Sequence, residues 1–448
     1  MTEKDAGAPV PMTNEDREER PRVRLLAVLV IGLAALVLRL GFVLSGEARM
    51  EFPDEAQYMN IAGNYANGQG LSVSVDGHGN VLEPNETMQR PPIYPLMLAV
   101  IVRFDPDTGA VRAAQVVQAV LGALTCIMIY VLARELTDEG AAWIAGGIAA
   151  VYPFFVYFTG RVLSETLFLL LFVTSWYFIV RMWKDLNARA GVTWWLGWCL
   201  VGGFLAAGAT LTRSSVLPVY LMVPGVMLLL GPRRLMGFAL GLLLVFVLFV
   251  GLSPWAARNW VHVKAATKEG GIVLTTCKVG ESLYEAVGPR ATGGPNKENT
   301  VWPEEVSAMR HDEYARNQYL LWRSLRYMRN NTKRTVRLAG VKFLRTWNVI
   351  PNYEAARTPL YITISLISYV PVLLTGILGL FLCMKRPQTV VWLMVPIVVF
   401  TLIHMIFVGS VRYRLAMMPF VMTFSGVTLW RLFCGWFKPT CVKVEEQN

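Results

Sequence analysis

The chain has 448 residues, of which 54% are hydrophobic and only 16% are charged. Soluble domains average roughly 45–50% apolar and about 25% charged residues, so the composition excludes an ordinary soluble protein, a disordered chain and a collagen-like repeat. The six cysteines include no CxxC spacing, which excludes a disulfide scaffold and a zinc or redox framework. The net charge is +11, but the basic residues are dispersed between apolar blocks, which indicates membrane topology signals rather than nucleic-acid binding.

Ten apolar runs are long enough to cross a bilayer, which takes about 20 residues each. The first covers residues 25–44; it is too long for a cleaved signal and has no A-x-A exit, so we expect a retained helix. The other nine cover residues 111–133, 141–158, 165–182, 194–211, 215–231, 235–255, 359–383, 389–408 and 413–430. A twelve-residue apolar run at 93–104 is too short to cross and predicts an interfacial or re-entrant helix. The fold class is therefore an all-α polytopic membrane protein.

The distribution of lysine and arginine predicts the orientation, because cytoplasmic segments carry an excess of both. The short turns on the side of the N-terminus hold most of these residues, so both termini are predicted to be cytoplasmic in a multi-pass inner-membrane protein. The predicted organisation is a disordered tail at 1–22, a transmembrane module at 23–255 with its outer loop 46–92, an outer (periplasmic) subdomain at 256–357, C-terminal spans at 358–431 and a cytoplasmic tail at 432–448. The subdomain is expected to end in an amphipathic helix near 334–350.

Ionisable residues are nearly absent from the predicted spans, whose central thirds contain no aspartate, glutamate or lysine. The nearest exceptions are Arg39, Glu165 and His404. Because pumps and ion-coupled transporters usually need buried carboxylates, their absence argues against that class. We expect His404 to be a satisfied core residue rather than a metal ligand.

An acidic pair follows the first span in the stretch EFPDEAQYMNIAGNYANGQG. Pro53 suits an early helical position, and Asp54 and Glu55 favour the positive end of a helix dipole. After the pair, Tyr58, Ile61, Ala62 and Tyr65 recur at helical spacing, which predicts a short helix on the membrane surface. The simplest interpretation is that the pair only begins this helix.

Other acids and arginines fall at the outer ends of separate spans. The positions are Arg90 before two prolines, Glu165 after Ser164, Arg213, Arg258, Arg412 and Arg414. Each alone is consistent with a turn, a cap or a snorkelling cation. Together they bring carboxylates, which can activate a hydroxyl, and arginines, which can hold a phosphate, to one leaflet. This combination predicts group transfer from a lipid-linked phosphate.

Six stretches carry a family resemblance and occur in family order: PDEAQYMNIAGNYANGQG, RPPIYPLMLA, YFTGRVLSETLF, LTRSSVLP, PWAARN and VRYRLAMMP. At these residues the sequence resembles the GT-C membrane glycosyltransferases. It is most similar to the bacterial proteins related to protein O-mannosyltransferases and aminoarabinose transferases, in glycosyltransferase family 39. The resemblance covers residues 25–430, and its most specific part is the acidic pair followed by RPPIYP. It implies a GT-C fold with about ten transmembrane helices, juxtamembrane helices on the outer face and a small outer subdomain.

The resemblance also implies an activity and roles for residues. The implied reaction transfers a sugar from a polyprenyl-phosphate donor, with inversion, to a hydroxyl of an envelope acceptor such as lipid A or another glycolipid, a polysaccharide, or a protein Ser/Thr. Asp54 is implied as the general base or acceptor-orienting group, and Glu55 and Glu165 as further catalytic acids. The implied phosphate ligands are Arg213, Arg258, Arg412 and Arg414, and the implied substrate-loop residues are Arg90 and Tyr94.

No cofactor is required by this interpretation, and the sequence has no HExxH or clustered His-Asp metal motif. A divalent ion near Asp54 and Glu165 stays open, because some relatives are thought to bind one there. The outer region of 256–357 is shorter than in some relatives, so the acceptor is not implied.

Two alternatives stay open at this point. A transporter or flippase of lipid-linked sugars would need a polar path through the spans, which the sequence does not contain. A polymerase or ligase acting on diphosphate-linked glycans would also lie in the membrane with outer arginines, but it would not need the pair Asp54 and Glu55.

Overall fold

The computed structural model describes residues 14–75, 81–104, 109–267, 270–295, 300–309, 312–350 and 357–437. Within these residues seven helices are long and apolar enough to cross a membrane. They are α1 (Asn14–Ser45), α4 (Ala110–Leu136), α7 (Glu165–Asn187), α8 (Val192–Thr210), α11 (Arg234–Thr267), α16 (Pro359–Leu382) and α17 (Pro387–Ile406). The prediction of an α-helical multi-pass membrane protein is confirmed.

The other three predicted spans are not single regular helices. Residues 141–158 form α5 (Glu139–Val151) and α6 (Pro153–Thr159), which meet at a 49° bend and count as an eighth span if taken together. Residues 215–231 form η1 (Ser214–Val216), α9 (Leu217–Leu221) and α10 (Val223–Leu229). Residues 413–430 form η3 (Tyr413–Ala416) followed by α18 (Met418–Phe437). Prolines at the first turns of α6, α9 and α10 explain the first two interruptions, because proline ends a preceding helix and begins a new one.

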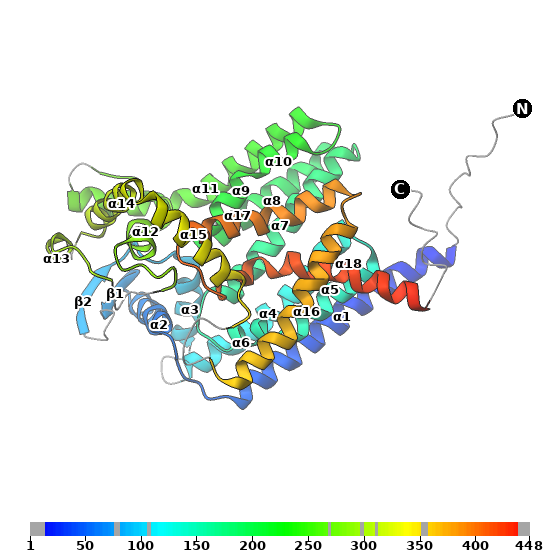
Figure 1. Cartoon of the computed structure of the whole chain (residues 1–448), viewed down its shortest axis with the longest axis horizontal. Coiled ribbons are helices and arrows are strands. Elements are labelled where there is room, and N and C mark those ends of the chain that lie inside the picture. Colours follow the sequence, from blue (N-terminus) through cyan, green and yellow to red (C-terminus); the bar gives the residue numbers. More distant parts are fainter. Residues whose placement is uncertain are drawn as a thin grey trace, which may run out of the picture.

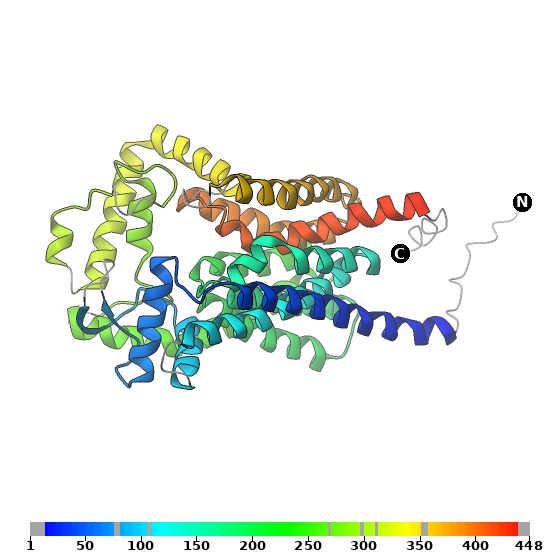
Figure 2. The same cartoon turned by 90° about the horizontal axis from the view of Figure 1, so that it is seen from below.

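The remaining elements gather at one end of the helix bundle (Figures 1 and 2). They are α2 (Pro53–Ala66), β1 (Ser72–Val75), β2 (Val81–Glu86), α3 (Ile93–Phe104), α12 (Val279–Val287), α13 (Glu305–Ala308), α14 (Glu313–Asn330) and α15 (Thr332–Trp347). The start of α1 and the end of α18 lie at the opposite end. The two long segments therefore share one end of the molecule, as predicted; we call it the outer end, and its orientation in the cell stays a prediction.

Two predicted boundaries are corrected by the structure. The first helix begins at Asn14, so the predicted tail at 1–22 is helical from that residue, and residues 1–13 and 438–448 lie outside the described part. The predicted boundary at 255 falls inside α11, which continues to Thr267. Pro254 does not interrupt this helix: the carbonyl of Val250, which a proline cannot bond, accepts a hydrogen bond from the Ser253 hydroxyl at 2.7 Å instead.

The predicted short elements are confirmed with one addition. The helix predicted at 93–104 is α3, and the amphipathic helix predicted near 334–350 is α15. The structure adds a two-stranded antiparallel sheet of β1 and β2, in which Ser72 lies opposite Glu86.

Arg39 lies inside the bundle, only 1% exposed, at the break between α5 and α6. Pro153 has no N–H for the carbonyl of Ala149, so the end of α5 is left with unbonded oxygens. The Arg39 guanidinium donates to Ala150 O at 3.0 Å and to Ala149 O at 3.3 Å. Arg39 is therefore a cap for a broken membrane helix.

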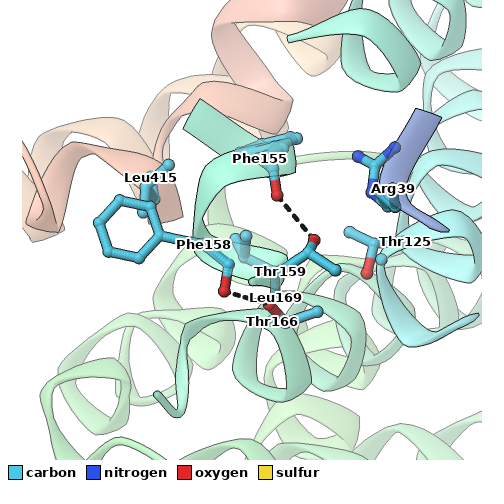
Figure 3. A pocket seen from close by; sticks show the side chains of 9 residues that line it. Arg39, Thr125, Phe155, Phe158, Thr159, Thr166, Leu169 and Leu415 are labelled. Atoms are coloured by element: carbon cyan, nitrogen blue, oxygen red, sulfur yellow. Dashed lines mark hydrogen bonds between the residues drawn. The ribbon is translucent and has the colours of Figure 1, made fainter. Parts of the chain in front are cut away.

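A small cavity lies beside this arginine (Figure 3). Its lining includes the hydroxyl side chains of Thr125, Thr159 and Thr166. Each hydroxyl donates to a backbone carbonyl, and Figure 3 shows two of these bonds, to Phe155 and Phe158. Thr125 and Thr159 thus bond carbonyls of their own helices, whereas Thr166 links α7 to α6.

Candidate active site

Asp54 occupies the first turn of α2, where Pro53 begins the helix. Its carboxylate accepts a hydrogen bond from the Arg90 guanidinium through Oδ1. Arg412 donates from Nη1 to Oδ2 at 3.2 Å. The Asp54 side chain is 31% exposed, so it is held between two arginines and still open to solvent or a substrate.

Arg412 joins Asp54 to a second carboxylate. Its Nε donates to Oε1 of Glu165, the first residue of α7, and the same oxygen accepts from Arg213 Nη1 at 2.7 Å. Glu165 is 2% exposed, and its other oxygen, Oε2, has no hydrogen-bond partner. Five segments far apart in sequence therefore meet at one ion-pair cluster of Asp54, Arg90, Glu165, Arg213 and Arg412.

Aromatic rings form one wall of this cluster. The rings of His404 and Tyr413 are stacked with centroids 4.4 Å apart, and Arg213 lies over Tyr413 at 5.6 Å. A cavity opens here, lined among others by Glu165, Arg213, Ser215, His404, Arg412 and Tyr413. His404 Nδ1 lies 3.2 Å from the Val408 carbonyl, as expected of a packed core histidine, although the ring also faces the cavity.

The cluster carries more positive than negative charge. Burial raises the pKa of the Asp54 carboxyl, but the charges of Arg90, Arg412 and Lys278 outweigh it and hold that pKa well below its usual value. With Arg213, four cations face the two carboxylates, and Glu285 on α12 adds an acid near Tyr413. A site with this surplus suits an anion that makes charge-assisted hydrogen bonds to arginine.

Glu55 is adjacent to Asp54 in sequence but has a different environment. It is fully buried, and Oε2 accepts from the backbone N–H groups of Glu51 at 2.6 Å and Phe52 at 2.8 Å. Its Oε1 accepts from the N–H of Val162 at 2.7 Å. Successive helical residues point about 100° apart, so the pair cannot share one site. The expectation that Glu55 acts catalytically beside Asp54 is corrected: its carboxylate ties the start of α2 to the turn before α7.

Three further predicted site residues also lie apart from the cluster. Arg258 donates to Glu86 Oε2 at 2.7 Å and to the Thr87 carbonyl at 3.1 Å. Arg414 donates to the Asn348 carbonyl at 2.6 Å and lies 3.4 Å from the ring centroid of Tyr369. These contacts use both guanidinium groups for structure.

Tyr94 is buried, and its hydroxyl donates to Gln118 Oε1 at 3.1 Å. Its ring packs edge-on against Tyr58, with centroids 4.9 Å apart. Tyr94 therefore supports the site through its contact with Tyr58, whereas Arg90 from the same predicted substrate loop contacts Asp54 directly.

Several residues of the site escaped the sequence interpretation. Gln57 Oε1 accepts from Arg90 Nε at 2.9 Å, and Arg90 lies 4.9 Å from the ring centroid of Tyr58. The spacing of three and four residues from Asp54 was the available signal, because such residues share a helix face. Lys278 and Tyr413 carried no comparable signal.

A divalent ion does not fit between the two carboxylates as they are arranged. Arg412 occupies the space between Asp54 and Glu165 and contacts both. The residues that the structure describes contain no group of three or more His, Cys, Asp or Glu side chains that could hold a metal ion.

Comparison with known proteins agrees with the architecture. Residues 89–257 match the family model of dolichyl-phosphate-mannose-protein mannosyltransferases. The archaeal oligosaccharyltransferase AglB of Archaeoglobus fulgidus, in complex with an inhibitory peptide and a dolichol-phosphate, superposes with a TM-score of 0.59 over 96% of this chain, at 13% identity. The chain has the GT-C fold.

This chain spans about half, 52%, of that oligosaccharyltransferase. The apo form of the A. fulgidus enzyme gives a TM-score of 0.58 at 14% identity, covering 94% of this chain and 52% of the other. The match to ArnT from Cupriavidus metallidurans, bound to undecaprenyl phosphate, covers 93% of this chain and 79% of the ArnT chain. The identity is 15% and the TM-score is 0.39. A search of curated proteins gives no match.

Proposed function

We propose that this chain is a glycosyltransferase that moves a sugar from a polyprenyl-phosphate donor to a hydroxyl of an envelope acceptor, with inversion. The observation that carries the proposal is the position of Arg412, which contacts both Asp54 and Glu165 at the wall of a cavity. Arg412 can exchange a carboxylate for a phosphate because Asp54 keeps Arg90 and Glu165 keeps Arg213 as ion-pair partners. The match of residues 89–257 and the fold shared with an enzyme that holds a dolichol-phosphate support this donor class.

The surplus positive charge fits the change that the donor undergoes. The phosphodiester of the donor has one negative charge, and the departing lipid phosphate has up to two. Arg412 and Arg213 both line the cavity, so in our proposal they bind the donor phosphate and stabilise the charge that develops on it. The free Oε2 of Glu165 is available to accept a hydrogen bond from a substrate hydroxyl.

Asp54 then acts on the acceptor. The acceptor oxygen forms a bond to the anomeric carbon, the bond from that carbon to the phosphate oxygen breaks with its electrons on the phosphate, and the acceptor proton passes to Asp54. In the free site Arg90 and Arg412 hold the pKa of Asp54 low, which makes it a weak base. A bound phosphate shares the charge of Arg412, so donor binding raises that pKa and prepares the base.

The proposed setting is a multi-pass protein of the inner membrane with both termini cytoplasmic and the cluster at the periplasmic face. The acceptor classes are a glycolipid such as lipid A, a polysaccharide, or a protein Ser/Thr. Mass spectrometry of envelope lipids, polysaccharides and proteins from a deletion strain would identify the missing sugar increment.

The test uses purified protein in liposomes with a labelled polyprenyl-phosphate sugar and an envelope extract as acceptor. We expect Asp54→Asn to lower transfer by about 10²–10⁴-fold, the usual contribution of a general base. Asp138→Asn is the matched control, because Asp138 pairs with an arginine, Arg386, in a turn before α5. Undiminished transfer in Asp54→Asn would contradict the proposal, and label that crosses the vesicle membrane without covalent transfer would favour the transporter.

A further inference from the structure

The helices α14 and α15 carry a charge pattern that the proposed function does not use. Residues 314–347 contain nine lysines and arginines and no aspartate or glutamate, in a chain whose net charge is +11. This segment lies at the outer end with the catalytic cluster (Figures 1 and 2). Because the run contains no acid of its own, it carries a surplus of positive charge that favours an anionic partner.

The helix α15 has two different faces. Leu338, Lys342 and Thr346 recur every four residues and are buried against the protein. On the opposite side Val336 and Leu344 are 67% and 68% exposed, which is unusual for large apolar side chains in water.

The exposed face combines these apolar side chains with cations. Lys333 and Arg337 are exposed; Lys333 lies three residues before Val336, and Arg337 lies three residues before Gly340 and seven before Leu344, which places them on the same side of the helix. A Cβ placed on Gly340 would meet no atom within 4 Å, so the part of the chain that the structure describes does not cover this face at Gly340. An apolar stripe flanked by basic residues is typical of a helix that lies in a membrane interface.

The position of α15 also matches a membrane interface. The Tyr369 hydroxyl donates to the Trp347 carbonyl at 3.1 Å, so the last residue of α15 lies beside the tenth residue after Pro359, where α16 begins. Ten residues of helix correspond to about 15 Å. At the other side, Lys342 Nζ donates at 2.6 Å to the carbonyl of Ile406, where α17 ends. The C-terminal half of α15 therefore lies beside the middle of one membrane-crossing helix, α16, and the end of another, α17.

We propose that the exposed face of α15 is seated in the bilayer leaflet at the outer end and that Lys333 and Arg337 bind anionic lipid headgroups there. The apolar side chains continue the lipid-facing surface of α16, where Leu366 and Ile367 are exposed. A soluble polyanion would match the charges but would leave Val336, Phe343 and Leu344 in water. The proposal does not depend on the chemistry of the active site.

The first test measures the depth of the helix in full-length protein reconstituted into phosphatidylcholine–phosphatidylglycerol vesicles. A fluorophore is attached to Leu344→Cys and, as control, to Glu304→Cys, both in a Cys441→Ser background; the five cysteines that the structure describes are buried. We expect lipids with brominated chains to quench the label at position 344 and aqueous iodide to quench the label at 304. Equal iodide quenching at both positions would overturn the proposal.

The second test measures the charge dependence with the double variant Lys333→Gln, Arg337→Gln. In the unmodified protein, quenching of the 344 label by brominated lipid should rise when phosphatidylglycerol is added to pure phosphatidylcholine, and the double variant should lose that rise. The control removes two exposed arginines elsewhere, as Arg189→Gln with Arg234→Gln, and should keep it. A double variant that responds like the unmodified protein would refute the lipid contact, as would protection of the 344 label by heparin in detergent without lipid.

Discussion

Two buried arginines, Arg412 and Arg39, show how differently one membrane protein uses the same side chain. Arg412 lies at the outer end between Asp54 and Glu165, at the wall of a cavity. Arg39 lies inside the bundle, and its guanidinium bonds the carbonyls of Ala149 and Ala150. The partners of Arg412 are carboxylates that can exchange for a substrate phosphate, whereas those of Arg39 are backbone oxygens and the buried Cys126 sulfur. We infer that the first arginine serves chemistry and the second serves folding.

The largest expected effect comes from removing the exchangeable cation. Arg412→Gln leaves Glu165 buried with only Arg213 and removes a ligand of the departing phosphate. We expect transfer to fall by about 10²–10³-fold, the usual cost of losing one preorganised donor to developing charge. Single-turnover transfer in liposomes measures this effect. Arg412→Lys, which keeps the charge but cannot span both carboxylates, should recover only part of the rate; full recovery would show that the bridging geometry is not needed.

The matching change at the other arginine should alter stability instead. Arg39→Met leaves the carbonyls of Ala149 and Ala150 without donors, and each unsatisfied buried group costs about 1–3 kcal/mol. We expect a lower thermal unfolding temperature in detergent, with donor binding retained below it. Arg39→Met protein that keeps its melting temperature but loses donor binding would reverse the assignment of the two arginines.

Glu55 should behave like Arg39 although it is adjacent to Asp54. In Glu55→Gln one oxygen becomes an N–H donor that faces a backbone N–H of Glu51, Phe52 or Val162. The expected loss is about 1–3 kcal/mol of stability, with transfer reduced far less than in Asp54→Asn. Equal losses of transfer in the two variants at a temperature where both are folded would restore Glu55 as a catalytic residue.

The smallest expected effect is a change in the free energy of unfolding at acid pH. The pKa of Asp54 is held below its usual 3.8, so its ion pairs contribute stability that is fully present above that pH. As the pH falls further, unfolded Asp54 takes up a proton while folded Asp54 does not, so the contribution declines by about 1.4 kcal/mol per pH unit. The difference in unfolding free energy between the unmodified protein and Asp54→Asn should therefore be constant from pH 7 to about 5 and shrink below it. A difference that shrinks between pH 7 and 5 would contradict the low pKa.

Hydropathy and the order of the segments predicted most of the membrane spans and the end of the molecule at which the site lies. Seven spans appear as predicted because a bilayer allows few alternatives to a long apolar helix. Pro153 and Pro224 indicate breaks in two of the apolar runs, but each run is long enough to be predicted as one span. The meeting of Asp54, Glu165 and Arg412 was predictable in outline because Asp54 follows the first span, Glu165 begins α7 and Arg412 follows α17, all at the same end.

The direction of a side chain was not predictable from position alone. Glu55 is adjacent to Asp54 but turned towards Val162, and Arg414 is two residues from Arg412 but turned towards Tyr369. Arg258 sits on a helix that extends beyond the predicted membrane boundary, which carries it to Glu86 instead of the cluster. These residues share a level in the membrane with the site, but tertiary packing decides which face of each segment meets it.

Binding of a polyprenyl phosphate is the most direct measurement of the central claim that Arg412, and not Arg39, meets the lipid phosphate. Isothermal titration in detergent micelles would compare the unmodified protein with Arg412→Gln and Arg39→Gln, all confirmed as folded at the working temperature. We predict saturable binding that is weakened at least about tenfold, or 1.4 kcal/mol, in Arg412→Gln and is unchanged in Arg39→Gln. Unchanged binding in Arg412→Gln would contradict the account.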